Sequence, residues 1–169
     1  MKRLAACLCA LGFLVSFVPA ISSGSAGGPY DSVTGAGVRG TIANPNTPFL
    51  NFDVSAHDGP NGVFGTYNSR SANPLVNFNG DVTCLYVNGD HAMVGGLVRK
   101  GGDTGQVGTA FFVGFIDNPS PTPDQVTLTS SFNPPPAPTA ADCAGVAAVL
   151  FTLPVLPLIS GNVEVNDAP

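Results

Sequence analysis

Short runs of aliphatic, aromatic and β-branched residues alternate with turn-forming residues along most of the chain beyond position 33. In residues 49–57, Leu50, Phe52 and Val54 fall on one face of an extended strand, and polar residues fall on the other. No intervening segment shows a helical period. The pattern predicts strands that each bury one face. We expect them at residues 33–43, 49–57, 63–67, 75–78, 82–87, 91–99, 106–116, 125–132, 146–153 and 162–165.

The hairpin signal is clearest around Asn88-Gly89, which separates the runs 82–87 and 91–99. We interpret this dipeptide as the two positive-φ residues of a type I′ turn. Strands that recur every 8 to 12 residues between turn signals are typical of antiparallel sheets. With 21 Gly, 16 Pro and 10% charged residues, the composition also favours many turns over helices. We therefore predict one all-β domain at residues 27–169, an antiparallel barrel or sandwich of about eight to ten short strands.

Several glycines, among them Gly37, Gly95 and Gly96, lie inside predicted strands. A glycine there leaves room for another side chain to lie across the sheet. We expect Phe111, Phe112 and Phe115 to cover such glycines in or near the core.

The amino terminus combines the basic residues Lys2 and Arg3 with an apolar run at residues 4–18. This is typical of a secretory signal peptide, and residues 1–26 are interpreted as signal and short leader, cleaved after Ala20 or Ala26. About 15 apolar residues are too few to span a bilayer. We expect a secreted, extracellular protein.

Removal of the signal leaves four basic and eleven acidic residues, a net charge of −7. Phosphate backbones are bound through clustered Lys and Arg, so nucleic acid is not an expected partner. The apolar segment 146–159 contains Pro154 and Pro157, which would break a membrane helix. We interpret it as an inner strand and a buried connection, and expect no stable membrane span.

Cleavage would leave Cys84 and Cys143 as the only cysteines. Exported proteins form disulfides, so we predict a bridge between them, with two buried free thiols as the alternative. Cys143 closely follows the proline-rich residues 133–138. The bridge would then hold this segment against the hairpin.

Two His–Asp neighbours, His57-Asp58 and Asp90-His91, are candidate parts of a hydrolytic triad with a nearby serine. Adjacent residues of a strand point to opposite faces, and no Gly-x-Ser-x-Gly motif is present. We expect both pairs to lie at strand ends beside turns, without a catalytic role.

Asp117, Asn118 and Asp124, with Asp103 as a further oxygen donor, are candidate ligands for calcium. The alternative is a turn braced by Pro119, Pro121 and Pro123, and we predict no metal and no cofactor.

The tyrosines Tyr30, Tyr67 and Tyr86 are expected to pack in the core or an interface rather than to form a sugar-binding platform.

A resemblance connects several of these signatures. Residues 80–87, Gly95-Gly96, Asp117-Asn118, Cys143 and the closing Gly161-Asn162-Val163 resemble small secreted β domains of high-GC, actinobacterial bacteria whose function is unknown. The resemblance spans residues 33–165 and implies export and an antiparallel sheet. It implies no active-site residue.

These observations predict a secreted, non-catalytic β module that binds an extracellular or surface partner or has a structural role. One alternative is a barrel that carries a small apolar ligand, which requires an interior pocket of roughly 300 Å³ or more among residues such as Phe52, Phe112 and Val126. The second alternative is a secreted hydrolase that uses His57 or His91.

Overall fold

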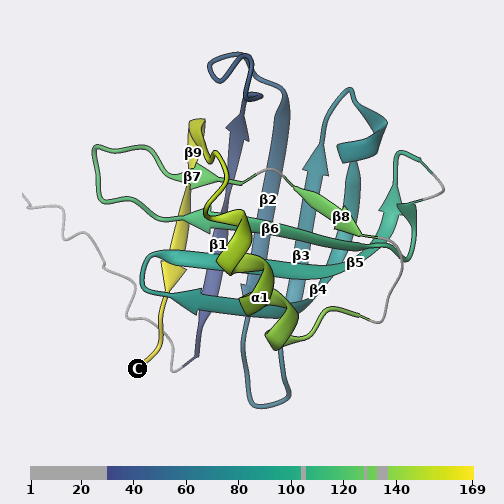
Figure 1. Cartoon of the computed structure of the whole chain (residues 1–169), viewed down its shortest axis with the longest axis vertical. Coiled ribbons are helices and arrows are strands. Elements are labelled where there is room, and N and C mark those ends of the chain that lie inside the picture. Colours follow the sequence, from purple (N-terminus) through teal and green to yellow (C-terminus); the bar gives the residue numbers. More distant parts are fainter. Residues whose placement is uncertain (1–29, 104–105, 128, 133–136) are drawn as a thin grey trace, which may run out of the picture.

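Eight antiparallel strands close into a β-barrel, and one helix lies on its outer surface (Figure 1). The structure is a computed structural model that describes residues 30–103, 106–127, 129–132 and 137–169. The predicted signal peptide lies outside these residues. The barrel strands are β1 (Ser32–Arg39), β2 (Leu50–His57), β3 (Phe64–Arg70), β4 (Phe78–Asn88), β5 (His91–Gly101), β6 (Ala110–Ile116), β7 (Gln125–Val126) and β9 (Leu156–Asn166).

The strands follow one another around the barrel from β1 to β6, and β7 and β9 complete the circle. β6 pairs with β7, β7 with β9, and β9 returns to β1. The short strand β8 (Ser130–Phe132) pairs with the beginning of β6, so β7 and β8 lie one after the other along it. Closure leaves the barrel strands paired on both sides, which removes the unpaired edges of an open sheet. The predicted fold class, an all-β antiparallel barrel or sandwich, is confirmed, and the structure is the barrel.

The turn of the β4–β5 hairpin differs from the predicted turn in position and type. Asn88 pairs with His91, so the two loop residues are Gly89 and Asp90. Gly89 has a φ of 61°. Among the described residues only glycines have a positive φ, so the φ of Asp90 is negative. A positive φ at the first loop residue alone is the pattern of a type II′ turn, which needs glycine there. The predicted type I′ turn at Asn88-Gly89 was placed one residue too early.

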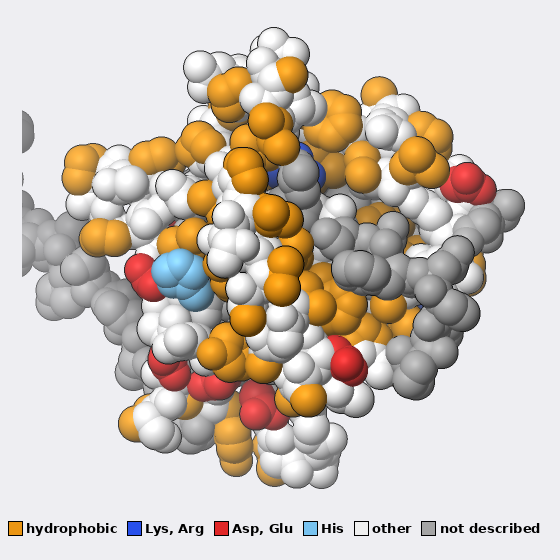
Figure 2. Space-filling model, in the orientation of Figure 1, with side chains coloured by type: hydrophobic (Ala, Val, Ile, Leu, Met, Phe, Trp, Pro, Cys, Tyr) orange, Lys and Arg blue, Asp and Glu red, His pale blue; other side chains and the backbone are white. Residues whose placement is uncertain are grey.

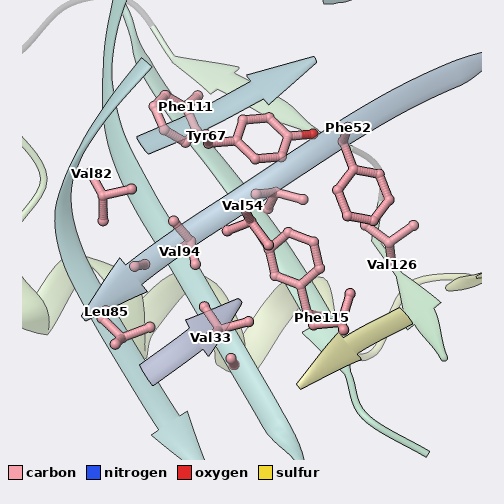
Figure 3. Close-up of a cluster of buried hydrophobic side chains, with 14 of the residues drawn as sticks. Val33, Phe52, Val54, Tyr67, Val82, Leu85, Val94, Phe111, Phe115 and Val126 are labelled. Carbon is pink, nitrogen blue, oxygen red and sulfur yellow. The ribbon is translucent and has the colours of Figure 1, made fainter. Parts of the chain in front are cut away.

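Inside the barrel, aromatic rings fill the space between the strands (Figure 3). The Tyr67 ring lies 5.5 Å from the Phe111 ring and 6.4 Å from the Phe115 ring. Phe52 contacts Phe115 with 5.5 Å between ring centroids. Aliphatic side chains such as Val126 pack around these rings. The interior described here is therefore a packed core, of the kind expected when eight strands close and side chains meet at the centre.

Two glycines show why the aromatic residues fit. A Cβ at Gly80 would lie 2.3 Å from the Phe111 ring, inside the barrel. On the outer side, a Cβ at Gly95 would lie 2.8 Å from the Phe112 ring. Both phenylalanines cover glycines, as predicted. Phe112, however, faces outward, whereas Phe52 and Val126 face the interior.

The helix α1 (Ala140–Leu150) occupies most of a segment predicted as a strand at 146–153. Its start is fixed by a capping box, in which Asp142 N donates to the Thr139 hydroxyl and Thr139 N donates to the Asp142 carboxylate. The helix is apolar on all sides, so the hydrophobic pattern carried no helical period. This explains why the strand prediction was wrong.

Several further boundaries differ from the prediction. β1 ends at Arg39 and not at residue 43, and β6 begins at Ala110 and not at residue 106. The first half of the expected strand at 75–78 is a 3₁₀ turn, η1 (Pro74–Val76), because Asn73 caps it and Pro74 favours its first position, and β4 begins only at Phe78. The expected strand at 125–132 is interrupted between β7 and β8. β9 begins at Leu156, earlier than the predicted residue 162, and includes Pro157.

α1 packs across β4, β5 and β6 and buries their outer face (Figure 1). This second core is separate from the barrel interior and contains Cys84, Met93, Ala110, Phe112, Cys143, Ala147 and Leu150. Figure 2 views the molecule from this side and shows hydrophobic side chains along the helix. None of the described helices is both long enough and apolar enough to cross a bilayer.

The predicted disulfide joins the helix to the barrel. The sulfur atoms of Cys84 on β4 and Cys143 on α1 are 2.02 Å apart, and their Cα atoms are 6.1 Å apart. Beside the bridge, the Thr83 hydroxyl donates to the carbonyl of Pro138 at 2.9 Å. The bridge and this hydrogen bond hold the segment before α1 against β4. Residues 133–136 of the proline-rich stretch lie outside the described residues.

Candidate binding face

The outer side of β2, β3 and the beginning of β4 carries polar side chains instead of a helix. Side chains alternate along these strands, so Phe52 and Tyr67 point inward while their sequence neighbours point outward. We call the outward set the open face. It consists of Asn51, Asp53, Ser55, His57, Phe64, Thr66, Asn68, Arg70 and Asn79.

A hydrogen-bonded ladder crosses the middle of the open face. Asp53, Asn68 and Asn79 lie side by side on three neighbouring strands. The Asn68 amide donates to the Asp53 carboxylate at 2.6 Å, and the Asn79 amide donates to the Asn68 side-chain oxygen. Each group keeps further donor or acceptor capacity, because an amide and a carboxylate have several sites each. The ladder therefore presents oriented polar groups to solvent.

An exposed aromatic ring lies at one end of the open face. Phe64 is 57% exposed, and its ring stacks on the His57 ring with 5.4 Å between centroids. His57 Nε2 lies 3.1 Å from the Ser55 hydroxyl. Phe64 and Asn68 are four positions apart on β3, so the ring lies about 13 Å along the strand from the ladder.

Arg70 marks the opposite end of the open face. A shallow hollow of about 390 Å³ lies between β2 and β1, lined by Asn51, Asp53, Arg70 and small residues of β1 and β9. A second hollow of about 390 Å³ lies on the other side of Asn51 and Arg70, beside Phe49. Asn51 and Arg70 are direct cross-strand neighbours. The guanidinium thus stands between two concave surfaces.

The two histidines lie in separate places, each with part of a triad. His57 contacts Ser55, while the Asp58 carboxylate accepts from Gly59 N at 2.8 Å. His91 Nδ1 lies 2.5 Å from the Asp90 carboxylate, and its ring contacts Phe151. Among the described hydrogen bonds, neither histidine joins both a serine and a carboxylate. As predicted, both pairs lie at strand ends: His57 closes β2 and His91 opens β5.

His91 borders a smaller groove between the β4–β5 hairpin and α1. The groove has a volume of about 270 Å³ and is lined by Tyr86, Asn88, His91, Phe151 and alanines of the helix. Tyr86 is half-buried here, and Tyr67 is fully buried in the barrel, so the expectation of packing roles holds for both. Tyr30 is 45% exposed beside the start of β1.

The candidate calcium ligands brace a loop. Asp124 accepts from Asn118 N at 3.0 Å and from Val163 N at 2.7 Å, and Asp117 accepts from Val165 N at 3.0 Å. Burial and the nearby acidic groups raise the pKa of Asp117, although its hydrogen bond from Val165 acts in the opposite direction. Asp103 lies beyond the other end of β6. In the described parts of the chain, no three His, Cys, Asp or Glu side chains are grouped to hold a metal.

Sequence reasoning did not identify the open face. The strand predicted at 63–67 ends before Asn68 and Arg70, so the outward phase shared by Phe64, Thr66 and Asn68 was not recognised. The signal was present, because a strand extended to residue 70 places these side chains on one polar face.

No protein-family model, curated protein or solved structure matches the chain. The resemblance to secreted actinobacterial domains therefore stays a prediction.

Proposed function

We propose that this protein is an exported, non-catalytic binding module whose open face binds a hydroxyl-rich polymer, namely a carbohydrate chain. The observation that carries the proposal is the ladder of Asp53, Asn68 and Asn79, which is held by hydrogen bonds on solvent-exposed strands. Polar groups that are already oriented lose little conformational freedom when a ligand binds.

The chemistry of the open face suits sugar hydroxyl groups. A hydroxyl both donates and accepts, and the ladder offers carboxylate acceptors, amide donors and amide acceptors in one row. Arg70 adds a guanidinium beside the concave surfaces. The exposed Phe64 ring provides an apolar surface for the C–H face of a sugar ring. Since the ring and the ladder are about 13 Å apart, an extended chain fits this strip better than a single sugar.

The interior supports this choice over an apolar-ligand carrier. A carrier needs an enclosed apolar pocket, and pockets for small molecules measure about 300 Å³ or more. The described interior is occupied by contacting rings, including Phe52, Tyr67, Phe111 and Phe115. Phe112, one of the expected pocket residues, lies outside the barrel under α1.

The placement of the histidines supports a non-catalytic role. A hydrolytic triad requires nucleophile, base and carboxylate in hydrogen-bond reach of one another. Ser55 and His57 form one pair and Asp90 and His91 another, on different strands. Within the open face, His57 is hydrogen-bonded to Ser55 and stacks on the Phe64 ring. This arrangement fits a role in positioning the ring.

The test is a binding assay of the purified protein on insoluble cellulose, chitin, xylan and peptidoglycan. We expect retention on at least one polymer, and at least a tenfold loss of affinity in Phe64→Ala and in Asp53→Ala. Leu75→Ala is the matched control, because Leu75 is 61% exposed on η1 outside the open face. Failure to bind any of the four polymers, or undiminished binding by both variants, would overturn the proposal.

A further inference from the structure

One end of the barrel interior holds a positive charge with no negative partner. Arg39, the last residue of β1, is 2% exposed and follows the inward phase of Val33 and Gly37. Its Nη1 donates to the carbonyl of Gly40 at 3.0 Å. Its Nε is buried and makes no hydrogen bond among the described residues.

No carboxylate of the described chain neutralises this guanidinium. All eleven Asp and Glu residues of the sequence fall within the described ranges. The ion pairs formed there are Arg99 with Asp81 and His91 with Asp90. An isolated charge is costly to remove from water, so buried charges are normally paired or bound to an ion.

Two buried hydroxyl groups accompany Arg39. Tyr67 is fully buried, and both its hydroxyl and that of Thr129 lack a hydrogen bond of acceptable geometry in the described structure. Burial raises the pKa of Tyr67, whereas the adjacent Thr129 hydroxyl and the charge of Arg39 lower it, so both groups lie close enough to the Tyr67 hydroxyl to act on it. Figure 3 shows the Tyr67 hydroxyl pointing away from Phe111 across the interior.

We propose that a small monovalent anion, a halide or a compact carboxylate, binds between Arg39, Tyr67 and Thr129 at this end of the barrel. The guanidinium Nε and the two hydroxyls are three donors, and an anion accepts from all of them. It also neutralises the buried charge. A water molecule would satisfy some of these donors but would leave the charge uncompensated.

The affinity must come from these local donors. The chain carries a formal net charge of −5, so its overall field repels anions. Chloride is therefore expected to stabilise the fold in proportion to its occupancy of the site, a gain that grows with the logarithm of its concentration. High ionic strength alone should not reproduce this gain.

The test measures thermal unfolding while sodium chloride replaces sodium gluconate at constant ionic strength. Gluconate is too bulky for the packed interior. We expect the melting temperature to rise with chloride, and Arg39→Met to remove the rise. Lys100→Met is the matched control, because it removes a positive charge from an exposed position. An acetate series distinguishes a site that also accepts carboxylates from one selective for halides.

Two measurements keep the test decisive if Arg39→Met does not fold. Tyr67→Phe removes one donor and keeps the ring, so we expect a folded protein with a weaker chloride dependence. In crystals grown with bromide, we expect an anomalous peak beside the Arg39 guanidinium. Stability that does not depend on chloride or acetate, together with a position that holds only water in the bromide crystal, would overturn the proposal.

Discussion

The outer face of β4–β6 and the outer face of β2–β3 belong to one barrel but have opposite environments. On β6, every residue from Ala110 to Phe115 is buried, because the interior covers one side and α1 the other. On β2, buried and solvent-accessible residues alternate from Leu50 to His57. The outward residues account for this difference. They are apolar on the covered side, as Met93 and Phe112 are, and polar on the open side, as Asn51 and Asp53 are.

This contrast shows how to interpret alternation in a barrel. A strand that loses its period-two pattern is buried on both faces and requires a cover. A strand that keeps the pattern presents its polar side to solvent, where a ligand can reach it. The covered side of this protein contributes stability, and the open side is available for binding.

Removal of the disulfide should lower the stability of the protein most, because the bridge joins α1 to the covered side of the barrel. The bridge closes a loop of 59 residues, for which the chain-entropy model gives about 4 kcal/mol of stability. The double variant Cys84→Ala with Cys143→Ala should therefore unfold at a clearly lower urea concentration. Treatment of the natural protein with a reductant should shift the midpoint in the same direction. Equal midpoints in all three samples would show that the bridge contributes little to stability.

Overpacking the covered side should have the next largest effect. A Cβ at Gly95 would lie 2.6 Å from the Cys84 sulfur, so Gly95→Val should destabilise the protein by about 1–3 kcal/mol. Ala36→Val is the control, since Ala36 is exposed on β1 and faces outward away from α1. Thermal unfolding of the two variants measures the difference. A melting temperature for Gly95→Val as high as for Ala36→Val would contradict the tight packing of α1 on the barrel.

Loss of the helix cap should have a smaller effect that depends on pH. Thr139→Ala removes the hydroxyl that accepts from Asp142 N, and such a change typically lowers the free energy of unfolding by about 1 kcal/mol. Hydrogen bonds from Thr139 also hold the pKa of Asp142 below its ordinary value of 3.8. A lowered folded-state pKa stabilises the protein above pH 3.8, and this contribution disappears as pH falls through the lowered value.

Urea unfolding of Thr139→Ala and the natural protein, at neutral pH and in strong acid, measures this dependence. We expect the difference in stability to shrink in acid, where the Asp142 carboxylate is protonated and no longer accepts as a charged group. A difference that is constant over the whole pH range would exclude a role for the charged carboxylate in the cap.

A change on the open face should have the smallest effect on stability. Asp53 is exposed and bonds only to Asn68 among the described residues, so Asp53→Ala should alter the unfolding free energy by no more than about 0.5 kcal/mol. The same variant should lose carbohydrate binding. Parallel urea and polymer-binding measurements separate the two properties. A destabilisation comparable to that of Gly95→Val would mean that the ladder is a structural element.

The sequence predicted the strands with clear alternation and the partners of the disulfide. Residues 50–57 and 91–99 were located because polar and apolar positions, or a glycine-containing turn, delimit them. The helix was missed because an all-apolar segment has no period, and only the capping pair Thr139 and Asp142 indicated it. The sequence could not show that Phe112 faces α1, since that orientation depends on closure of the barrel and on the position of a helix far away in the chain.

The candidate sites were less predictable than the fold. Asp53, Asn68 and Asn79 are ordinary polar residues in the sequence, and the cross-strand register alone brings them into one row. Arg39 likewise shows no sign of burial until its phase with Val33 and Gly37 is known. Both sites arise from pairing between strands, which local patterns do not encode.

Carbohydrate binding at the open face is measured most directly by titrating the isotopically labelled protein with soluble oligosaccharides of cellulose, chitin and xylan and following the amide chemical shifts in NMR spectra. We expect shifts concentrated on β2 and β3 around Asp53, Phe64 and Asn68, with α1 and its underlying strands unaffected. Shifts confined to α1 and β4–β6, or none with any of the three sugars, would contradict it.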